Sequence, residues 1–546
     1  MSQTIVYRAR RIVTMAAHQP FATHVAVREG RVLCVGDAQD VAQFPDARRD
    51  DRFADAVLTP GFVEGHAHAH EGALWSRPYV GYFGRTSPDG AFVGGCESID
   101  AVVARLKAIS DASADADAPL FAWGFDPIYF GGRRMDARDL DRVSPRRPVL
   151  VIHASLHIVN VNSVALARAG LDETTPIAGL PRGADGRLTG EIQGPAPRAH
   201  LFRALGLSGI AGSPQPEDYR RFARSANVAG VTTITDLHSD LSDTTLAALR
   251  ALASDESAPV RIAPAYGALG APAEEGAAKV MALTKENSDR LFFGIAKFVI
   301  DGSIQGFTAR LKWPHYHNGA SNGLWYVAPD EFPRLFEIFH RAGVQVHVHT
   351  NGDEATDVAL DAIERALIAV PRPDHRHTLQ HCQLASAAQY RRMKALGVCV
   401  NLFSNHLWHW GEAHVEQTIG PERAARMNAA ATAERLGVPF AIHSDAPVTP
   451  LAPLFTAWCA VNRLTHKGRL LGPHERISVE SALHAITLGA AFTLRLDHLV
   501  GSIEIGKFAD FAVLEEDPLA QPAERLKDIR VLGTIFGGVW REAPRA

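Results

Sequence analysis

Short apolar runs recur along the middle of the chain, and most of them follow a stretch whose apolar residues keep helical spacing. The runs span 56–66, 230–238, 260–267, 291–302, 344–350, 377–383, 397–404 and 439–447. Near-continuous apolar strands that alternate with helices are typical of a parallel sheet covered on both faces. We therefore predict an α/β fold, a (β/α)8 TIM-like barrel. An open doubly wound sheet is the alternative, although no GxGxxG follows an early strand to favour it.

Both ends of the chain depart from this alternation and consist of short strand patterns with tight turns. Near the N-terminus, "HVAVREGRVLCVGD" pairs two strands across "REG", and residues 501–541 have the same character. We predict that residues 1–57 and 496–546 together form a composite β-sandwich domain, which flanks a barrel over residues 58–495.

A stretch of about 150 residues separates the first two barrel strands, far more than a barrel loop requires. It contains one helical pattern, in which Ile99, Val102, Val103, Leu106 and Ile109 share a face, and a strand-like run over 148–162. We predict an inserted, lid-like subdomain over residues 75–225.

Composition narrows the class of protein. Of 546 residues, 46% are hydrophobic and 21% charged, and the net charge of −4 gives no sign of a nucleic-acid-binding surface. Neither a secretory signal nor a run of 18 apolar residues is visible, which argues against export and a membrane span. The five cysteines are scattered and form no CxxC, so we expect a reduced cytoplasmic protein.

Three histidines follow the first apolar run, in "LTPGFVEGHAHAHEG". Alternate residues of a strand point the same way, so His66 and His68 can present two ring nitrogens to one metal ion. A polar strand end with chance hydrogen bonds is the competing interpretation, and these residues alone do not decide between the two.

Other polar residues lie near the carboxyl ends of further predicted strands. Lys297 lies in the fourth run, His349 ends the fifth, His381 is at the end of the sixth and Asp445 at the end of the eighth. Barrels assemble their active sites at this end. Lys297 is flanked by apolar residues, where a bare ammonium is costly to bury, so it needs a partner, a shifted pKa or a chemical change.

The motifs together resemble the amidohydrolase superfamily. "PGFVEGHAH", a strand lysine in mid-chain, two single-strand histidines and "HSDAP" carry the resemblance. The segments "KFVIDGSIQGFTA", "HTNGDEATDVALDAIE", "LQHCQL", "HSDAPVTPLAPL", "HIVNVNSVALARAGL" and "GSIEIGKFADFAVLEEDP" resemble the branch that contains the N-substituted formamide deformylases. The sequence departs from the family pattern at two places. "HTNGD" replaces the more usual apolar residues after His349, and "LQHCQ" lacks the acidic residue often found before His381. Both departures concern substrate contacts or the groups that orient the ligands, not the ligands themselves.

The resemblance implies a divalent metal centre, with zinc as the expected metal in one or two ions. His66, His68 and Asp445 would hold one ion, and His349 and His381 a second, with Lys297 carboxylated as the bridge. His381 and Asp445 would be the catalytic residues, with Asp445 acting on the metal-activated water as general base and then as general acid. The resemblance also suggests a homodimer.

Other residues have both a functional and a structural interpretation. Substrate contacts are predicted for Trp123, Asp126, His157, Phe403 and Trp408. Trp123 and Asp126 could instead only hold the insert together, and the aromatic cluster 403–411 could be surface packing. For His70 and His347 we expect polar filling or hydrogen bonds rather than metal binding.

The sequence therefore predicts a metal-dependent hydrolase that cleaves an amide or formamide type of C–N bond in a small, partly apolar substrate. The same metal barrel could instead catalyse hydration, decarboxylation or isomerisation. A catalytically silent barrel used for binding is the third hypothesis, and the intact ligand set argues against it.

Overall fold

A computed structural model describes residues 3–131, 133–156, 158–207 and 214–544. By its internal contacts the chain divides into two compact units, one of residues 1–68, 223–446 and 451–544, and one built mainly of residues 69–222 with 447–450. The predicted barrel and both chain ends lie in the first unit.

The first unit contains a sheet of eight parallel strands. In sheet order these are β18 (Phe440–Ile442), β17 (Cys399–Leu402), β16 (Thr378–His381), β15 (Gln345–Thr350), β14 (Ile295–Val299), β13 (Arg261–Gly267), β12 (Val231–Ser239) and β5 (Phe62–Val63). Its two edges meet: Ala67 pairs with Ala446, and the His68 amide donates to the Ala446 carbonyl at 2.8 Å. This arrangement confirms the TIM-like barrel and excludes an open doubly wound sheet.

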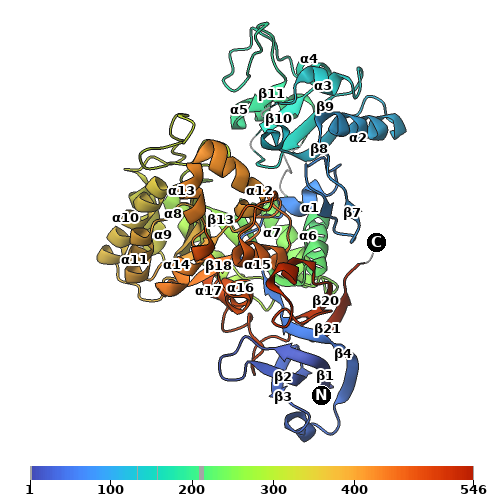
Figure 1. Ribbon diagram of the computed structural model, residues 1–546, viewed down its shortest axis with the longest axis vertical. Coiled ribbons are helices and arrows are strands. Elements are labelled where there is room, and N and C mark those ends of the chain that lie inside the picture. The colour runs from blue at the N-terminus through green and yellow to red at the C-terminus, as the bar shows by residue number, and fades with distance from the viewer. Residues whose placement is uncertain (1–2, 132, 157, 208–213, 545–546) are drawn as a thin grey trace. The chain divides into compact units, whose positions relative to one another are not determined.

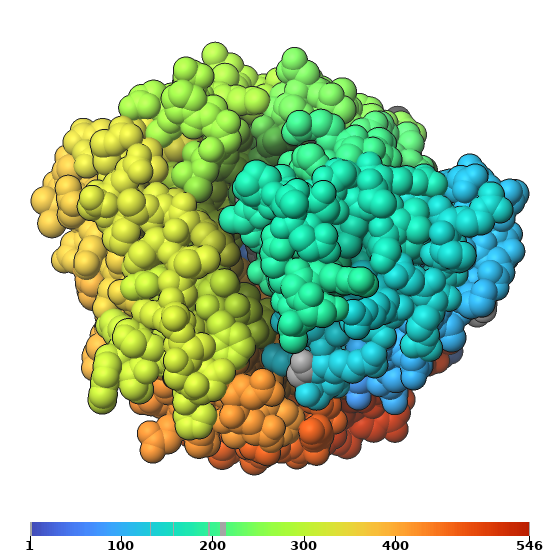
Figure 2. Space-filling model, turned by 90° about the horizontal axis from the view of Figure 1, so that it is seen from above, coloured from blue at the N-terminus to red at the C-terminus, as the bar shows by residue number. Residues whose placement is uncertain are grey.

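Helices fill the connections between the barrel strands. From β12 to β17 they are α7 (Asp243–Ser254), α8 (Ala273–Leu283), α9 (Phe332–Arg341), α10 (Asp353–Ala369) and α11 (Ala387–Leu396). Helix α9 buries Phe332, Phe336 and Phe339 at helical spacing, and Phe298 of β14 packs edge-on against the first and last of these rings. Figure 2 shows the green, yellow and orange segments of the first unit following one another in chain order around the visible face.

The connection from β17 to β18 holds three helices, α12 (Asn405–Ala413), α13 (Gly420–Arg426) and α14 (Ala430–Arg435), and a π-helical turn over His414–Thr418. Three more helices follow β18, namely α15 (Pro453–Asn462), α16 (Val479–Ala485) and α17 (Leu488–Thr493).

Strands from both chain ends join in one sheet of seven. In sheet order these are β21 (Val539–Glu542), β20 (Val531–Phe536), β19 (Phe511–Leu514), β4 (Arg48–Pro60), β1 (Ile5–Val13), β2 (Phe21–Arg28) and β3 (Arg31–Gly36). Figure 1 shows the blue N-terminal strands beside the red C-terminal ones. Strand β4 continues past the predicted boundary at residue 57, so this sheet leads almost directly into the first barrel strand.

The second unit has a four-stranded sheet of its own, in the order β11 (Glu191–Gln193), β10 (Ile158–Val161), β9 (Val149–His153) and β8 (Leu120–Phe125). The predicted helix is α2 (Ile99–Ala112), with Ser98 accepting the Ala101 amide at its N-terminus. The single strand-like run expected over 148–162 is instead two antiparallel strands, β9 and β10, because the chain turns between them.

Candidate metal centre

Side chains from opposite ends of the chain meet where the barrel edges join. The Nε2 atoms of His68 and His66, which follow β5, lie 3.2 and 3.4 Å from Oδ1 of Asp445, which follows β18. The backbone keeps them there, because the Asp445 amide donates to the His66 carbonyl at 3.0 Å. These three residues form one group whose ligand atoms lie within 4.8 Å of one another. The predicted first ligand set is therefore brought together.

Two further predicted ligands come from neighbouring strands. His349 of β15 pairs in register with Gln380, directly before His381, and the rings of His349 and His381 lie 4.5 Å apart. Nδ1 of His381 lies 3.9 Å from Oδ2 of Asp445, and the His381 ring lies 4.7 Å from that of His66. The second predicted set thus adjoins the first.

Lys297 is buried on β14, with 2% of its surface exposed. Among the described residues, its Nζ has no hydrogen-bond partner. Burial lowers the pKa of Lys297 to about 7, against the opposing effect of the Asp445 carboxylate. The amine is therefore easily deprotonated, as carboxylation or metal binding requires.

The electrostatics of the other groups also suit a cation. Burial, and next the nearby Lys297, lowers the pKa of His66 well below its usual value. Burial would raise the pKa of Asp445, but the hydrogen bond from His68 and the neighbouring basic groups lower it overall. Neutral imidazoles beside an ionised carboxylate are the donor set that a divalent metal takes.

A glutamine fixes the orientation of His66. Nδ1 of His66 donates to Oε1 of Gln380 at 2.8 Å, and Nε2 of Gln380 donates to Nδ1 of His347 at 2.9 Å. Nε2 of His347 donates in turn to the carbonyl of Thr493 at 3.0 Å. Because a carbonyl only accepts, this order of donors leaves Nε2 of His66 as the nitrogen with a lone pair for a metal. His347 is thus hydrogen-bonded, as expected.

Two buried carboxyl groups hold the loops that carry the ligands. Glu64 accepts from the Ser444 hydroxyl at 2.7 Å and from the His66 amide at 3.1 Å. Asp301 accepts from the amides of Asn351 and Gly352 at 3.0 and 2.9 Å, directly after His349. The unusual "HTNGD" segment therefore belongs to an anchor for the end of β15.

The backbone is strained at the ligands. His381, Cys382 and Asp445 have φ values of 71°, 44° and 53°, a region that residues with a Cβ seldom adopt. Such conformations persist when surrounding contacts enforce them, and they gather at functional sites. Here they turn His381 and Asp445 toward the common centre.

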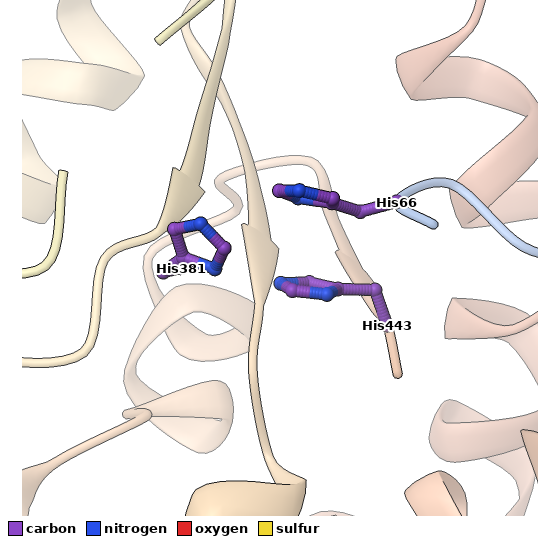
Figure 3. A group of neighbouring side chains, drawn as sticks. All are labelled: His66, His381 and His443. Carbon is purple, nitrogen blue, oxygen red and sulfur yellow. The ribbon is translucent and has the colours of Figure 1, made fainter. Parts of the chain in front are cut away.

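Sequence reasoning missed His443. This residue follows β18, is fully buried, and forms a second group of close ligand atoms with His66 and His381 (Figure 3). It shares strand parity with Asp445, the same signal that identified His66 and His68.

The predicted substrate residues have different surroundings. Phe403 is buried and lies 5.8 Å from the His381 ring, whereas Trp408 packs on His409 and Phe455. Trp123 lies in the core of the insert, 1% exposed, with its indole bonded to the Arg77 carbonyl, which favours a packing role. Asp126 accepts the Ile128 amide at the start of a 3₁₀ turn. His157 lies outside the described residues.

Comparison with known proteins decides the family. The sequence profile described as "Amidohydrolase family" matches residues 54–540. The chain belongs to the amidohydrolase family. LONG AFTER FAR-RED 3 of Arabidopsis thaliana is 29% identical, over 96% of this chain and 89% of that protein. An N-substituted formamide deformylase of Arthrobacter pascens is 26% identical, over 97% and 96%.

A solved structure supports the fold. An uncharacterized metal-dependent hydrolase from Pyrococcus horikoshii matches with a TM-score of 0.72 and 20% identity, over 95% of this chain and 99% of that chain. The predicted branch of the amidohydrolases is confirmed, and with it a hydrolase of this family. Within the described residues, no helix is long and apolar enough to cross a membrane.

Proposed function

We propose that this amidohydrolase cleaves a formamide or related amide C–N bond in a small, partly apolar substrate, with a divalent metal as cofactor. The observation that carries the proposal is the meeting of His66, His68 and Asp445 across the closed barrel, with Nε2 to Oδ1 distances of 3.2–3.4 Å. The whole-length similarity to a deformylase supports the formamide bond.

The metal would be zinc, held by His66, His68 and Asp445, with His349, His381 and a carboxylated Lys297 available for a second ion. Among the described residues, the buried Nζ of Lys297 and Nδ1 of His381 have no hydrogen-bond partner. A bound cation would give Nδ1 of His381 a partner, and carboxylation would turn Nζ of Lys297 into a carbamate whose oxygens can bind the cation. When bound, such an ion acts as a Lewis acid on a carbonyl and makes water a stronger acid.

Asp445 would move the proton. Its lowered pKa keeps the carboxylate ionised near neutral pH, so one Oδ atom can accept a proton from the attacking water and pass it to the leaving nitrogen. His381, beside Oδ2 of Asp445, would help to hold the reacting carbonyl. Buried Phe403, next to His381, would give the substrate an apolar surface.

Finer features also remain proposals. These are the β-sandwich character of the terminal domain, the lid role of residues 75–225, the substrate contacts of Trp123, Asp126, His157 and Trp408, a cytoplasmic location and a homodimer. Sedimentation of the purified protein tests the last of these.

A substrate panel tests the function. Protein loaded with Zn²⁺ is incubated with matched N-formyl, N-acetyl and ester compounds that carry the same aromatic amine or alcohol, and formate, acetate and amine are measured. We expect amine and formate in stoichiometric amounts from the N-formyl compounds, and none from metal-free protein. If fully loaded protein cleaves no member of the panel but adds water to an unsaturated acid, the alternative reaction class holds.

A further inference from the structure

His443 is a buried histidine whose two ring nitrogens meet no hydrogen-bond partner in the described part of the chain. It follows β18, and its exposed fraction is 0%. Among the residues that the structure describes, neither Nδ1 nor Nε2 has a hydrogen-bond partner. Buried polar atoms are almost always hydrogen-bonded, because an atom buried without a partner loses its hydrogen bonds to water and gains none in the protein. These two nitrogens are therefore available to a ligand.

Two other buried histidines show what ordinary packing looks like in this fold. His347 uses both nitrogens, toward Gln380 and Thr493. His414 also uses both, since Nδ1 lies 2.8 Å from the Thr418 hydroxyl and Nε2 lies 3.1 Å from Nδ1 of His406. All three side chains are fully buried. The orphan nitrogens of His443 are thus a property of its position at the barrel mouth, where the predicted ligands gather.

The ring of His443 is held in place by its neighbours. It stacks on His66 with centroids 4.5 Å apart and planes 19° apart, and on Phe403 at 4.8 Å and 27°. The His381 ring lies 5.0 Å away. Figure 3 shows the rings of His66 and His443 one above the other, with His381 facing their ends. One nitrogen from each of these three rings lies within 4.8 Å of the other two.

We propose that His443 is a metal ligand, whose nitrogen would bind the same ion as His381, while the stacked His66 ring supports it from one side. This inference rests on the proposed metal-dependent function and adds to the ligands that the family resemblance implies. Imidazole ligands favour Zn²⁺, Co²⁺ or Ni²⁺ over Mg²⁺ and Ca²⁺, which prefer oxygen ligands.

The test compares wild type with His443→Phe after loading with Co²⁺. Phenylalanine keeps a flat, slightly larger ring between His66 and Phe403 and removes both nitrogens. We expect His443→Phe to bind Co²⁺ at least about tenfold more weakly in competition with a chelator, and its visible Co²⁺ spectrum to change because one nitrogen ligand is lost. The matched control is His414→Phe, which removes the nitrogens of an equally buried histidine outside the group of His66, His381 and His443 and should keep the wild-type spectrum.

The outcomes separate this inference from the proposed function. If wild type binds Co²⁺ and His443→Phe binds it equally well with the same spectrum, His443 is not a ligand, while the metal-dependent function stands. If wild type binds no metal, the proposed function itself fails. Should His443→Phe not fold, anomalous scattering from crystals of Co²⁺-loaded wild type decides. A His443 nitrogen at about 2.0–2.1 Å from cobalt supports the assignment, and a separation beyond about 3 Å overturns it.

Discussion

Oε1 of Gln380 accepts the Nδ1 proton of His66 at 2.8 Å, and this contact selects the tautomer of a proposed metal ligand. The tautomer of His66 is set through two further hydrogen bonds. His347 must donate to the Thr493 carbonyl, so it can only accept from the Gln380 amide, which leaves the Gln380 oxygen to accept from His66. Gln380 occupies the place in "LQHCQ" where the resembled family often has an acidic residue. A neutral amide performs the orienting role here and adds no negative charge beneath the ligands.

Replacing Gln380 with leucine should therefore weaken metal binding without unfolding the barrel. The His66 ring loses the acceptor that fixes its tautomer, so we expect affinity for Zn²⁺ to fall about 10- to 100-fold in chelator competition. The control is Gln389→Leu. Gln389 is equally buried but binds Asp353 and Asp357 on the neighbouring helix α10. Equal metal affinities for the two variants would contradict the orienting role.

Strand periodicity and strand order placed the six residues at the carboxyl ends of predicted strands, and the family resemblance implied that they are metal ligands. His66 and His68 share strand parity, and a barrel brings the carboxyl ends of Lys297, His349 and His381 to the edge that also carries Asp445. The predicted helix preceding β15 is also observed, since the apolar face of "DEFPRLFEIFHRAG" packs on β14. These features are encoded locally, and the fold then assembles them.

Other parts of the site could not be predicted, because they depend on contacts between distant residues. Gln380 and His66 are 314 positions apart, and nothing in "LQHCQ" indicates which side chain its amide will meet. For His443, strand parity was available in the sequence, but only the folded chain shows that both nitrogens lack a partner among the described residues. The turn that divides 148–162 into two strands was hidden by apolar residues on both sides of it.

Glu64 should be replaceable by glutamine but not by alanine. It is 2% exposed, and burial raises its pKa to about 8, so near neutral pH it is largely a neutral carboxylic acid that glutamine resembles. We expect Glu64→Gln to lower the free energy of unfolding by less than about 1 kcal/mol. Glu64→Ala leaves the His66 amide without its acceptor and should cost about 3 kcal/mol. Urea unfolding of both variants measures the difference, and equal losses would show that the hydrogen bonds do not matter.

A buried ion pair fastens the barrel to the seven-stranded sheet. Nε and Nη2 of Arg261, at the start of β13, donate to the two carboxylate oxygens of Asp510 at 2.7 and 3.1 Å, and both side chains are at most 3% exposed. Arg261→Met leaves the buried Asp510 carboxylate without its positively charged partner, so we expect the free energy of unfolding to fall by about 3–5 kcal/mol. The double variant Arg261→Met with Asp510→Leu should recover part of this loss.

An exposed pair of similar geometry is the control for this prediction. Arg250 donates to Glu286 at 2.9 Å through two nitrogens, with side chains 49% and 39% exposed. Arg250→Met should cost under about 1 kcal/mol, because water and salt already screen that pair. If Arg261→Met costs no more than Arg250→Met, the buried pair does not fasten the two parts.

Asp445→Asn should separate catalysis from folding. The amide keeps the shape of the side chain and one oxygen, but it cannot accept a proton, so we expect kcat to fall at least about 10²-fold while the protein stays folded and retains much of its metal. Single-turnover rates with the best N-formyl substrate, together with metal analysis of the same sample, measure both effects. Near-normal kcat would remove Asp445 from its proton-transfer role.

The stability of metal-free protein should fall as the pH drops from about 6.5 toward 4. Burial lowers the pKa of His153, in the insert, to about 4 and that of His414, beside the barrel, to about 3. Each is neutral in the fold and protonated when unfolded, so the unfolded state binds more protons throughout this window. The stabilisation is complete above pH 6.5, and each histidine removes up to about 1.4 kcal/mol per pH unit below it.

His414→Gln, which cannot titrate, isolates one of these contributions. Urea unfolding at half-unit pH steps gives the slope of the unfolding free energy, and above pH 4.5 carboxylate titration contributes least. We expect the slope of the variant between pH 4.5 and 6 to be smaller than that of wild type by about one proton. An unchanged slope would mean that His414 is already protonated in the folded protein, in conflict with its burial and with its contact to Nδ1 of His406.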